Sequence, residues 1–197
     1  FDVYKKNFIL KEVSLLFKQF IAPTKELAQQ QDKEIEIKIE KSEIFVNPDQ
    51  YKELFSSLLH IFRNAVDHGI ESREERIAKN KNEKAELIIN FDVQENKKFK
   101  ITIKDDGKGI NPKIIKEVGL KKEKLKHLKW DSISDKEIIQ LIFEPGFSSK
   151  EEVTNISGRG IGMDAVKTEV TKLKGDVKVE SKVDVGTRFE ILIPLYN

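Results

Sequence analysis

The stretch 49–71 constrains the fold of this chain more than any other, because it predicts a long helix with two different faces. Apolar side chains recur at helical spacing along one face: Tyr51, Leu54, Phe55, Leu58, Leu59, Phe62 and Val66. Polar side chains three or four residues apart share another face: His60, Asn64, Asp67 and His68, with Arg63 beside them. Gly69 is placed to end the helix. The helix must therefore bury its apolar face and hold its polar face either over a polar cavity or against solvent.

The rest of the chain alternates predicted strands and helices. In the clearest strand, 34–40, the residues Ile35, Ile37 and Ile39 alternate with charged residues and so share one buried face. We predict further strands over 44–46, 85–93, 98–104, 176–181 and 187–195, and helices over 8–31 with a kink or break at Pro23, over 113–118, over 134–143 and over 164–173. The residues placed to cap helices are Asn47, Asn111 and Ser134.

This order of elements predicts an α+β protein with a single domain over residues 1–197. The expected architecture is a two-layer α/β sandwich, in which helices pack on one face of one mixed, mostly antiparallel sheet. The charged segment 72–84 fits neither layer, and we predict a mobile surface segment with at most one helical turn.

Composition narrows the classes of protein to which the chain can belong. The 36 Lys and Arg residues nearly balance the 34 Asp and Glu residues, so no basic excess indicates nucleic acid as a partner. The absence of cysteine excludes disulfides, thiol nucleophiles and thiolate zinc sites. No apolar run approaches the roughly 18 residues of a membrane-spanning helix, so we expect no membrane contact by this segment. Since the first residue is Phe, we expect the chain to be part of a longer protein.

Two glycine-rich segments lie where predicted elements begin or end, which is where binding sites collect. Asp105-Asp-Gly-Lys-Gly109 follows a strand, and its glycines allow tight turns and close approach of a ligand to the backbone. Ser157-Gly-Arg-Gly-Ile-Gly-Met-Asp164 opens a helix, whose free N–H groups favour phosphate. This second segment is not a Walker loop, because no Lys-Ser/Thr follows its last glycine. Taken alone, either segment also reads as an ordinary turn.

Taken together, four segments resemble the ATP-binding domain of histidine kinases in the GHKL superfamily. Asn64, the segment 105–109, the segment 143–147 and Gly158-Arg-Gly-Ile-Gly162 are similar, in order and spacing, to the N, G1, F and G2 boxes of that family. The wording of His60-x-x-Arg-Asn-Ala-x-Asp-His-Gly-Ile-Glu71 and of Phe143-x-Pro-Gly-Phe-Ser148 is closest to the chemotaxis kinase (CheA) type. The lead-in over 8–49 looks more like that of ordinary sensor kinases.

The resemblance implies the Bergerat ATP-binding fold, with ATP as ligand and Mg²⁺ as cofactor. Asn64 would ligate Mg²⁺, Asp105 would accept a hydrogen bond from the adenine amino group, and Gly109 would make room for the ring. Segment 119–157 would form the ATP lid, anchored by Phe143 and Phe147. The other residues that the resemblance places around the nucleotide are Asp67, His68, Gly107, Ile110, Lys113, Ser157, Gly158, Arg159, Gly160, Ile161, Gly162, Met163 and Thr187.

The residue at position 60 distinguishes the members of the superfamily that hydrolyse ATP from those that transfer its phosphate. Its hydrolytic members carry a Glu four residues before the Asn that binds Mg²⁺, where it activates water, and this chain carries His60 there. The resemblance therefore implies transfer of the ATP γ-phosphate, with His60, Arg63 and Asn64 as catalytic residues. His60 and His68 belong to the site and His127 lies in the lid. We therefore expect the acceptor histidine on a dimerisation or phosphotransfer domain outside this chain.

The resemblance further implies a response regulator downstream and a cytoplasmic location, whether or not the parent protein is anchored in a membrane. Two alternatives stay open. One is a non-catalytic nucleotide-sensing or interaction module of the same fold, against which the intact Asn64 and Asp105 argue. The other is a GHKL serine kinase of the anti-sigma-factor type, against which the long lid argues.

Overall fold

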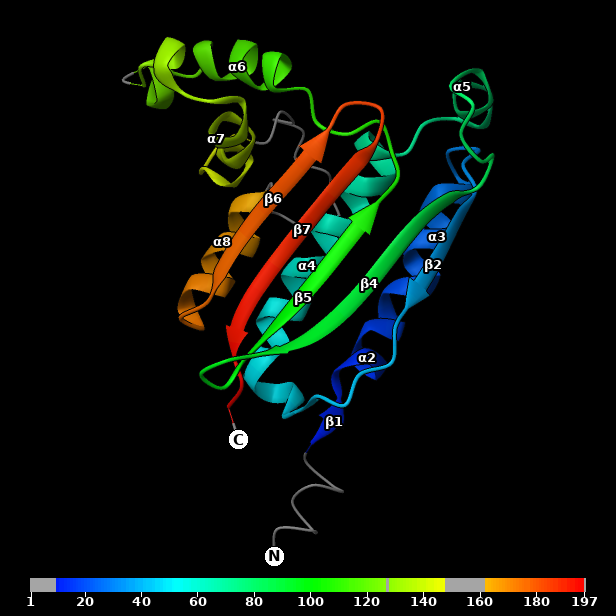
Figure 1. Cartoon of the computed structure of the whole chain (residues 1–197), viewed down its shortest axis with the longest axis vertical. Coiled ribbons are helices and arrows are strands. Elements are labelled where there is room, and N and C mark those ends of the chain that lie inside the picture. Colours follow the sequence, from blue (N-terminus) through cyan, green and yellow to red (C-terminus); the bar gives the residue numbers. More distant parts are fainter. Residues whose placement is uncertain (1–9, 127, 148–161, 197) are drawn as a thin grey trace, which may run out of the picture.

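The computed structural model describes residues 10–126, 128–147 and 162–196 of the chain. One sheet forms the front layer in Figure 1, and the helices α2, α3, α4 and α8 form the layer behind it. The helices are α2 (Val13–Phe17), α3 (Ile21–Gln29), α4 (Lys52–Asn64), α5 (Arg73–Ala78), α6 (Pro112–Leu120), α7 (Asp135–Gln140) and α8 (Met163–Lys172). The strands are β1 (Lys11–Glu12), β2 (Ile35–Ile39), β3 (Phe45–Val46), β4 (Ala85–Gln94), β5 (Lys98–Asp105), β6 (Asp176–Lys182) and β7 (Gly186–Pro194).

The main sheet is mixed and mostly antiparallel, as predicted. Its strand order is β2-β4-β5-β7-β6, and β2 runs parallel to β4 while the other neighbours are antiparallel. The two short strands β1 and β3 pair only with each other. Alternate residues of β5 and β7, such as Phe99, Ile101 and Ile191, are buried against the helices. The predicted fold class is therefore confirmed.

The central helix begins and ends as the sequence predicts. The side chain of Asn47 accepts a hydrogen bond from the backbone N–H of Asp49, and a short 3₁₀ turn over Pro48–Tyr51 leads into α4. A π-helical turn, Ala65–Gly69, continues α4. One prediction on this helix is wrong, since Leu59 is 40% exposed and Ile61 is buried instead. Leu59 lies about 100° around the helix from Leu58, outside the stripe that faces the sheet.

The first helical region is divided, as the proline predicts. The predicted helix is wrong at its start, because Lys11–Glu12 form strand β1, which pairs with β3, and α2 begins only at Val13. A 3₁₀ turn covers Lys18–Phe20, and α3 follows from Ile21. Pro23 lies in the first turn of α3 and has no N–H to donate to the carbonyl of Gln19, so the turn before it is not a regular α-helix. Residues 8 and 9 of the predicted helix lie outside the described part of the chain.

The charged segment 72–84 contradicts the prediction of a mobile surface segment. It contains α5, which Ser72 and Glu75 cap reciprocally: Ser72 Oγ accepts from the N–H of Glu75, and the Glu75 carboxylate accepts from the N–H of Ser72. Arg76 of this helix is only 1% exposed. The segment is held because its central cation is buried among partners, which charge density alone does not reveal.

The segment 112–147 packs as an outlying helical unit at the upper left of Figure 1. Leu125, Trp130 and Phe147 form a small cluster of buried apolar residues separate from the main core. Phe143, by contrast, belongs to the main core, where its ring meets that of Phe189 edge-on at 6.3 Å between centroids. The predicted capping box of Ser134 and Glu137 is present at the start of α7.

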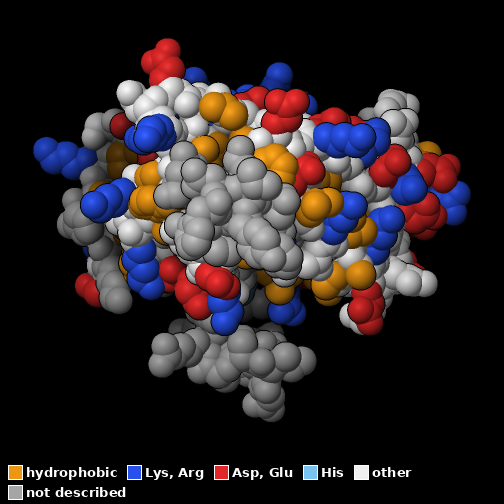
Figure 2. Space-filling view, turned by 90° about the horizontal axis from the view of Figure 1, so that it is seen from below, with side chains coloured by type: hydrophobic (Ala, Val, Ile, Leu, Met, Phe, Trp, Pro, Cys, Tyr) orange, Lys and Arg blue, Asp and Glu red, His pale blue; other side chains and the backbone are white. Residues whose placement is uncertain are grey.

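The opposite end of the molecule is shown in Figure 2, where hydrophobic side chains lie among charges of both signs. Large exposed apolar side chains among the described residues include Leu15, Phe45 and Val93. Within the described ranges, no helix combines the length and the apolar character that crossing a membrane requires.

Candidate functional site

A buried carboxylate ends strand β5. Asp105 is 4% exposed, and its Oδ1 accepts hydrogen bonds from the backbone N–H groups of Gly107 at 2.9 Å and Thr187 at 3.2 Å. Burial raises the pKa of Asp105 to about 6, and Asp106 adds to the rise, while the two N–H groups and Lys81 oppose it. The described part of the chain supplies no hydrogen bond to Oδ2. One oxygen of this carboxylate is thus held by the backbone, and the other remains for a ligand.

Glycines let several backbone segments converge on this carboxylate. A Cβ at Gly107 would clash with the carbonyl group of Gly69, at the end of the π-helical turn. Gly109 has a φ of +70° and approaches the carbonyl of Lys182 so closely that a Cβ would clash there too. The glycines thus allow tight turns and close approach of backbone to backbone, while the approach of a ligand stays a prediction.

Hydrogen bonds join the same segments into one corner, which we call the Asp105 corner and define as residues 69, 105–110, 181 and 186–187. The N–H of Lys108 donates to the carbonyl of Gly69 at 2.8 Å. The N–H of Ile110 donates to Ser181 Oγ at 2.8 Å, and this hydroxyl lies 3.1 Å from Thr187 Oγ1. The structure therefore brings together Asp105, Gly107, Gly109, Ile110 and Thr187, which the sequence placed around the nucleotide.

The polar face of α4 adjoins this corner. Asn64 is the last residue of α4 and is half-buried. A Cβ on Gly69 would lie 3.7 Å from the backbone oxygen of Asn64 and 3.8 Å from Asp105 Oδ1, so both border the same glycine. Asp67 is engaged elsewhere, since its carboxylate accepts from Gln31 Nε2 at 2.6 Å and from Arg63 Nε at 3.4 Å. The backbone of Asn64 therefore borders the Asp105 corner, whereas the carboxylate of Asp67 is held by Gln31 and Arg63.

The two histidines of the face differ in burial. His60 is half-buried; burial lowers its pKa, Arg63 lowers it further, and Asp164 at the start of α8 opposes this shift. Its imidazole is consequently neutral near pH 7. His68, in the π-helical turn, is exposed.

The glycine-rich segment that the sequence assigns to phosphate is described only from Gly162, where α8 begins. Gly162 is the N-cap, so no side chain at the cap accepts from the first N–H groups of this helix. Met163 is buried in the main core. Lys113 is exposed at the start of α6. Several predicted residues lie outside the described part of the chain: Ser157, Gly158, Arg159, Gly160 and Ile161. His127 lies outside it too.

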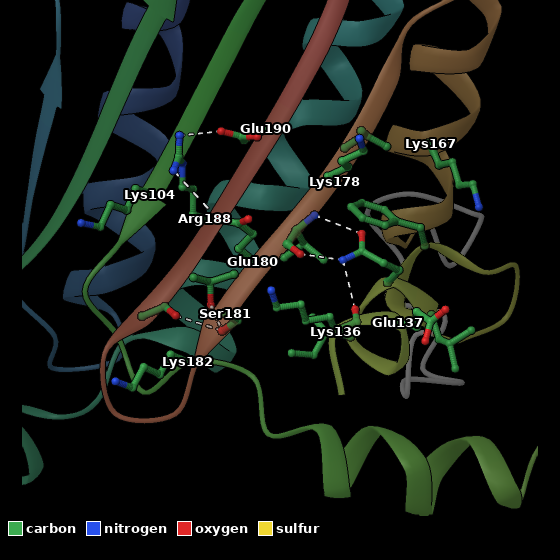
Figure 3. A pocket seen from close by; sticks show the side chains of 18 of the residues that line it. Lys104, Lys136, Glu137, Lys167, Lys178, Glu180, Ser181, Lys182, Arg188 and Glu190 are labelled. Carbon is green, nitrogen blue, oxygen red and sulfur yellow. Dashed lines mark hydrogen bonds and ion pairs between the residues drawn. The ribbon is translucent and has the colours of Figure 1, made fainter. Parts of the chain in front are cut away.

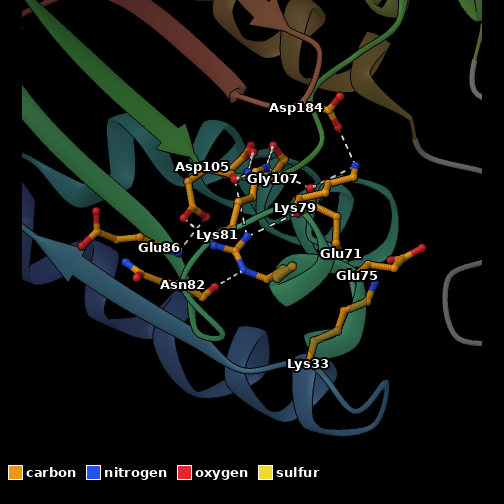
Figure 4. A network of polar contacts seen from close by, with 12 residues as sticks. Lys33, Glu71, Glu75, Lys79, Lys81, Asn82, Glu86, Asp105, Gly107 and Asp184 are labelled. Atoms are coloured by element: carbon orange, nitrogen blue, oxygen red, sulfur yellow. Dashed lines mark hydrogen bonds and ion pairs between the residues drawn. The ribbon is translucent and has the colours of Figure 1, made fainter.

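The sequence reasoning missed a buried network of charges behind the Asp105 corner, shown in Figure 4. It consists of Glu71, Arg76, Lys81 and Asp106. Burial alone would raise the pKa of Glu71, but the hydrogen bond from Lys81 and the charges of Lys81 and Arg76 lower it below its ordinary value. One signal was present in the sequence, because Ser72 and Glu75 have the spacing of a capping box and so predicted an ordered helix carrying Arg76.

A cavity of about 810 Å³ lies between α7 and the strands β6 and β7, and it borders the Asp105 corner because Ser181, Gly186 and Thr187 line both (Figure 3). Its lining includes Lys136, Gln140 and Arg188, but neither Asn64 nor Asp105. The side-chain amide of Gln140 pairs with the edge strand there, donating to the carbonyl of Val179 at 2.6 Å and accepting from its N–H at 3.1 Å. We therefore place the candidate site at the Asp105 corner, where a buried titratable group and converging backbone meet.

The donor set can be tested for the metal and nucleotide that the sequence implies. Among the described residues, no three His, Asp or Glu side chains form a group that could hold a metal ion by themselves. Mg²⁺ is ordinarily bound by one or two protein oxygens together with substrate phosphates and water, so the side chain of Asn64 fits that habit. The buried carboxylate with one oxygen to spare fits an amine donor such as the adenine amino group.

Comparison with known families and proteins agrees with this geometry. The family described as histidine kinase-, DNA gyrase B-, and HSP90-like ATPases (HATPase_c) matches residues 53–197. The sensor histidine kinase CheAY of Helicobacter pylori is 39% identical over 94% of this chain and 23% of its own length. The chemotaxis protein CheA of Borreliella burgdorferi is 40% identical over 93% of this chain and 21% of its own length. The chain thus spans less than a quarter of the length of these relatives.

Solved structures share the fold at low sequence identity. The mycobacterial sensor histidine kinase MprB has a TM-score of 0.57 and 17% identity, over 94% of this chain and 97% of that one. The catalytic domain of the histidine kinase ThkA has a TM-score of 0.57 and 14% identity, over 94% of each chain.

Proposed function

Because the chain belongs to the family of histidine kinase-, DNA gyrase B-, and HSP90-like ATPases, we propose that it is the ATP-binding catalytic domain of a protein histidine kinase. In this proposal it transfers the γ-phosphate of ATP to a histidine on a dimerisation or phosphotransfer domain of the parent protein. A response regulator receives the phosphate downstream, and the reaction takes place in the cytoplasm. Relatives named as histidine kinases along nearly the whole chain support the proposal.

Adenine recognition is the part of the proposal for which the geometry argues most strongly. The spare oxygen of Asp105 accepts the hydrogen bond from the adenine amino group, while its Oδ1 stays on the N–H groups of Gly107 and Thr187. Gly109 lets this turn approach the carbonyl of Lys182, which keeps the segment after β5 against the end of β6 beside Asp105. A guanine base presents a carbonyl oxygen at the corresponding position, which a carboxylate repels, so the corner selects ATP over GTP.

The phosphate end of the site is formed by α4 and α8. Asn64 provides an oxygen for Mg²⁺, which neutralises phosphate charge and orients the reacting oxygens when bound. The uncapped N–H groups that follow Gly162 favour phosphate oxygens. Arg63 adds a positive charge to the same face. We further propose that the predicted glycine loop over 157–161 completes this end and that 119–157 is the ATP lid.

The catalytic preference follows from His60. His60 occupies the position where the hydrolytic members of the superfamily carry the Glu that activates water, so this chain lacks that carboxylate. Transfer to a protein acceptor therefore outcompetes hydrolysis, which would waste ATP. The described histidines His60 and His68 act on the donor side of the reaction in this account.

The proposal is tested by supplying the chain with Mg²⁺-ATP labelled at the γ-phosphate and a candidate phosphotransfer domain. The expected product on that domain is labile to acid and stable to base, as phosphohistidine is. Asn64→Ala, which removes the Mg²⁺ ligand, should abolish labelling. An acid-stable product would indicate a serine kinase instead, and ATP binding with no transfer to any histidine acceptor would indicate a nucleotide-sensing module. No binding of ATP by the unsubstituted chain would sink the proposal.

A further inference from the structure

We infer that Arg76 and Lys81 are positioning residues for adenine recognition, cations that hold Asp106 and Gly107 in place so that Asp105 keeps one carboxylate oxygen for the base. The inference rests on the proposed function, since it concerns how the same site is held in shape. It assigns a role to the charged residues 71–82, whose partners include the backbone and side chain of Asp106.

Arg76 joins the segment after the central helix to the segment after β5. Its Nη2 donates to Asp106 Oδ2 at 2.6 Å, its Nη1 lies 3.3 Å from Glu71 Oε2, and its Nε donates to the carbonyl of Asn82 at 2.5 Å. The other oxygen of Asp106 accepts from the N–H of Glu86 on β4 at 2.9 Å. A planar guanidinium with several fixed donors suits this task, because it can hold three partners in one geometry.

Lys81 forms hydrogen bonds with the backbone of the same turn. Its Nζ donates to the carbonyl of Asp106 at 2.8 Å, to the carbonyl of Gly107 at 2.7 Å and to Glu71 Oε1 at 2.9 Å (Figure 4). These three bonds use all the donors of an ammonium group. Both carbonyls belong to the turn that directs the N–H of Gly107 at Asp105 Oδ1, so the cation fixes the orientation of the two peptides that follow Asp105.

Burial makes this network sensitive to the loss of any member. The side chains of Arg76 and Glu71 are each 1% exposed, so removing one partner leaves a charge in a poorly solvated place. If the turn relaxes, the N–H of Gly107 no longer holds Oδ1, and the carboxylate is free to rotate away from the base. The loss of binding affinity therefore comes from the contacts with adenine, and the contacts with the phosphates are unchanged.

The test compares Arg76→Gln with Arg73→Gln, a control on the same helix whose ion pair with Glu83 is more than half exposed. Binding of ATP and of GTP is measured for each variant, with GTP followed by competition up to millimolar concentration. Arg76→Gln should weaken ATP binding about 10- to 100-fold, the range expected for hydrogen bonds to a charged group, and leave GTP binding within about twofold. Arg73→Gln should leave both unchanged. The ratio of ATP to GTP affinity thus falls only for the buried arginine.

Two results would overturn the inference: unchanged ATP binding by Arg76→Gln, or a parallel fall in ATP and GTP binding, which a general loss of structure would produce. If Arg76→Gln does not fold, Lys81→Met carries the same expectations, because this side chain is partly exposed and its aliphatic stem is retained. Asp105→Asn separates this inference from the proposed function. Loss of ATP binding by Asp105→Asn with normal binding by both network variants contradicts the inference alone, whereas no ATP binding by the unsubstituted chain contradicts the proposed function.

Discussion

The Asp105 corner and the outlying helical unit over 112–147 are held by different kinds of interaction. The corner rests on backbone hydrogen bonds and on buried charges whose geometry is fixed by several partners each. The outlying unit rests on the small apolar cluster of Leu125, Trp130 and Phe147, and on ion pairs such as Lys116 with the fully exposed Asp131. Apolar contacts are non-directional and exposed ion pairs contribute little, so this unit can shift without a large penalty, whereas the corner cannot.

The difference fits the work that each region would do. A base-recognition site must keep a carboxylate oxygen in one place, and directional bonds accomplish that. The outlying unit is held by apolar packing, as Trp130 shows: its ring packs closely against Gly119, and its buried Nε1 finds no hydrogen-bond partner among the described residues. The outlying unit joins the rest of the domain through Gln140 at the end of α7, which pairs with the edge strand β6, and through Phe143 in the following 3₁₀ turn, which enters the main core.

The largest expected effect compares two phenylalanines of the same motif on either side of this boundary. Phe143→Ala removes a ring from the main core and should lower the free energy of unfolding by about 3–5 kcal/mol. Phe147→Ala removes a ring from the small cluster and should leave the main unfolding transition within about 1 kcal/mol, because that cluster contributes little to the core. Denaturant unfolding followed by circular dichroism measures both. Equal destabilisation would show that the outlying unit and the core unfold as one.

The next effect concerns the destabilisation of the fold by the buried carboxylate of Asp105. The rise of the Asp105 pKa from 3.8 to about 6 corresponds to about 3 kcal/mol of destabilisation when the carboxylate is ionised. Since the folded pKa exceeds the unfolded one, the cost is complete above pH 6 and disappears as the pH falls towards 3.8. Asp105→Asn should therefore raise the free energy of unfolding at pH 7.5 by up to about 3 kcal/mol. The difference from the parent chain should shrink as the pH is lowered from 6 to 4.

A smaller effect is expected where the two regions join. Gln140→Ala removes both hydrogen bonds to Val179 and should destabilise the contact of α7 with β6 by about 1–2 kcal/mol. Hydrogen exchange at the amide of Val179 should accelerate, while amides of β5 stay protected. Gln19→Ala, which removes an exposed side chain bonded only to the nearby carbonyl of Leu16, serves as the control. An unchanged exchange rate at the amide of Val179 would show that Gln140 does not hold α7 against β6.

The smallest effect is the pH dependence that His60 adds. Burial and Arg63 lower its folded pKa, so the unfolded chain takes up a proton first as the pH falls through about 6.5. His60 therefore lowers the free energy of unfolding on the acid side of neutrality. Asp105 lowers it at higher pH, so the two pH dependences run in opposite directions. His60→Gln should be more stable than the parent at pH 5.5 and no more stable at pH 7.5, as measured by denaturant unfolding at the two pH values.

Periodicity and capping residues were enough to predict most of the fold from the sequence. The alternation at Ile35, Ile37 and Ile39 gave a real strand, and Asn47 and Ser134 cap the helices that they were expected to cap. The sequence also placed Asp105, Gly107 and Gly109 in one site, because glycine spacing encodes the turns that bring them together. The prediction that Leu59 is buried is wrong, because helical spacing alone does not say which flank of an apolar stripe faces solvent.

The charges behind the corner could not be predicted in the same way. Arg76 and Lys81 lie in a run of charged residues that is indistinguishable by composition from a solvated surface. Their burial depends in part on Asp106, which follows β5 and lies 30 residues from Arg76 along the chain. Pairing of that kind is a tertiary property, and only the capping box at Ser72 hinted at order in this segment.

The most direct test of the Asp105 corner as the adenine site is calorimetric titration of Mg²⁺-ATP into the unsubstituted chain and Asp105→Asn at pH 7.5. The amide can still accept from Gly107 and Thr187, but its other end presents donors to the adenine amino group instead of an acceptor. We predict binding by the unsubstituted chain and a loss of affinity of about 100-fold or more in Asp105→Asn, a variant that is at least as stable. Equal affinities of the two proteins for ATP would contradict the assignment.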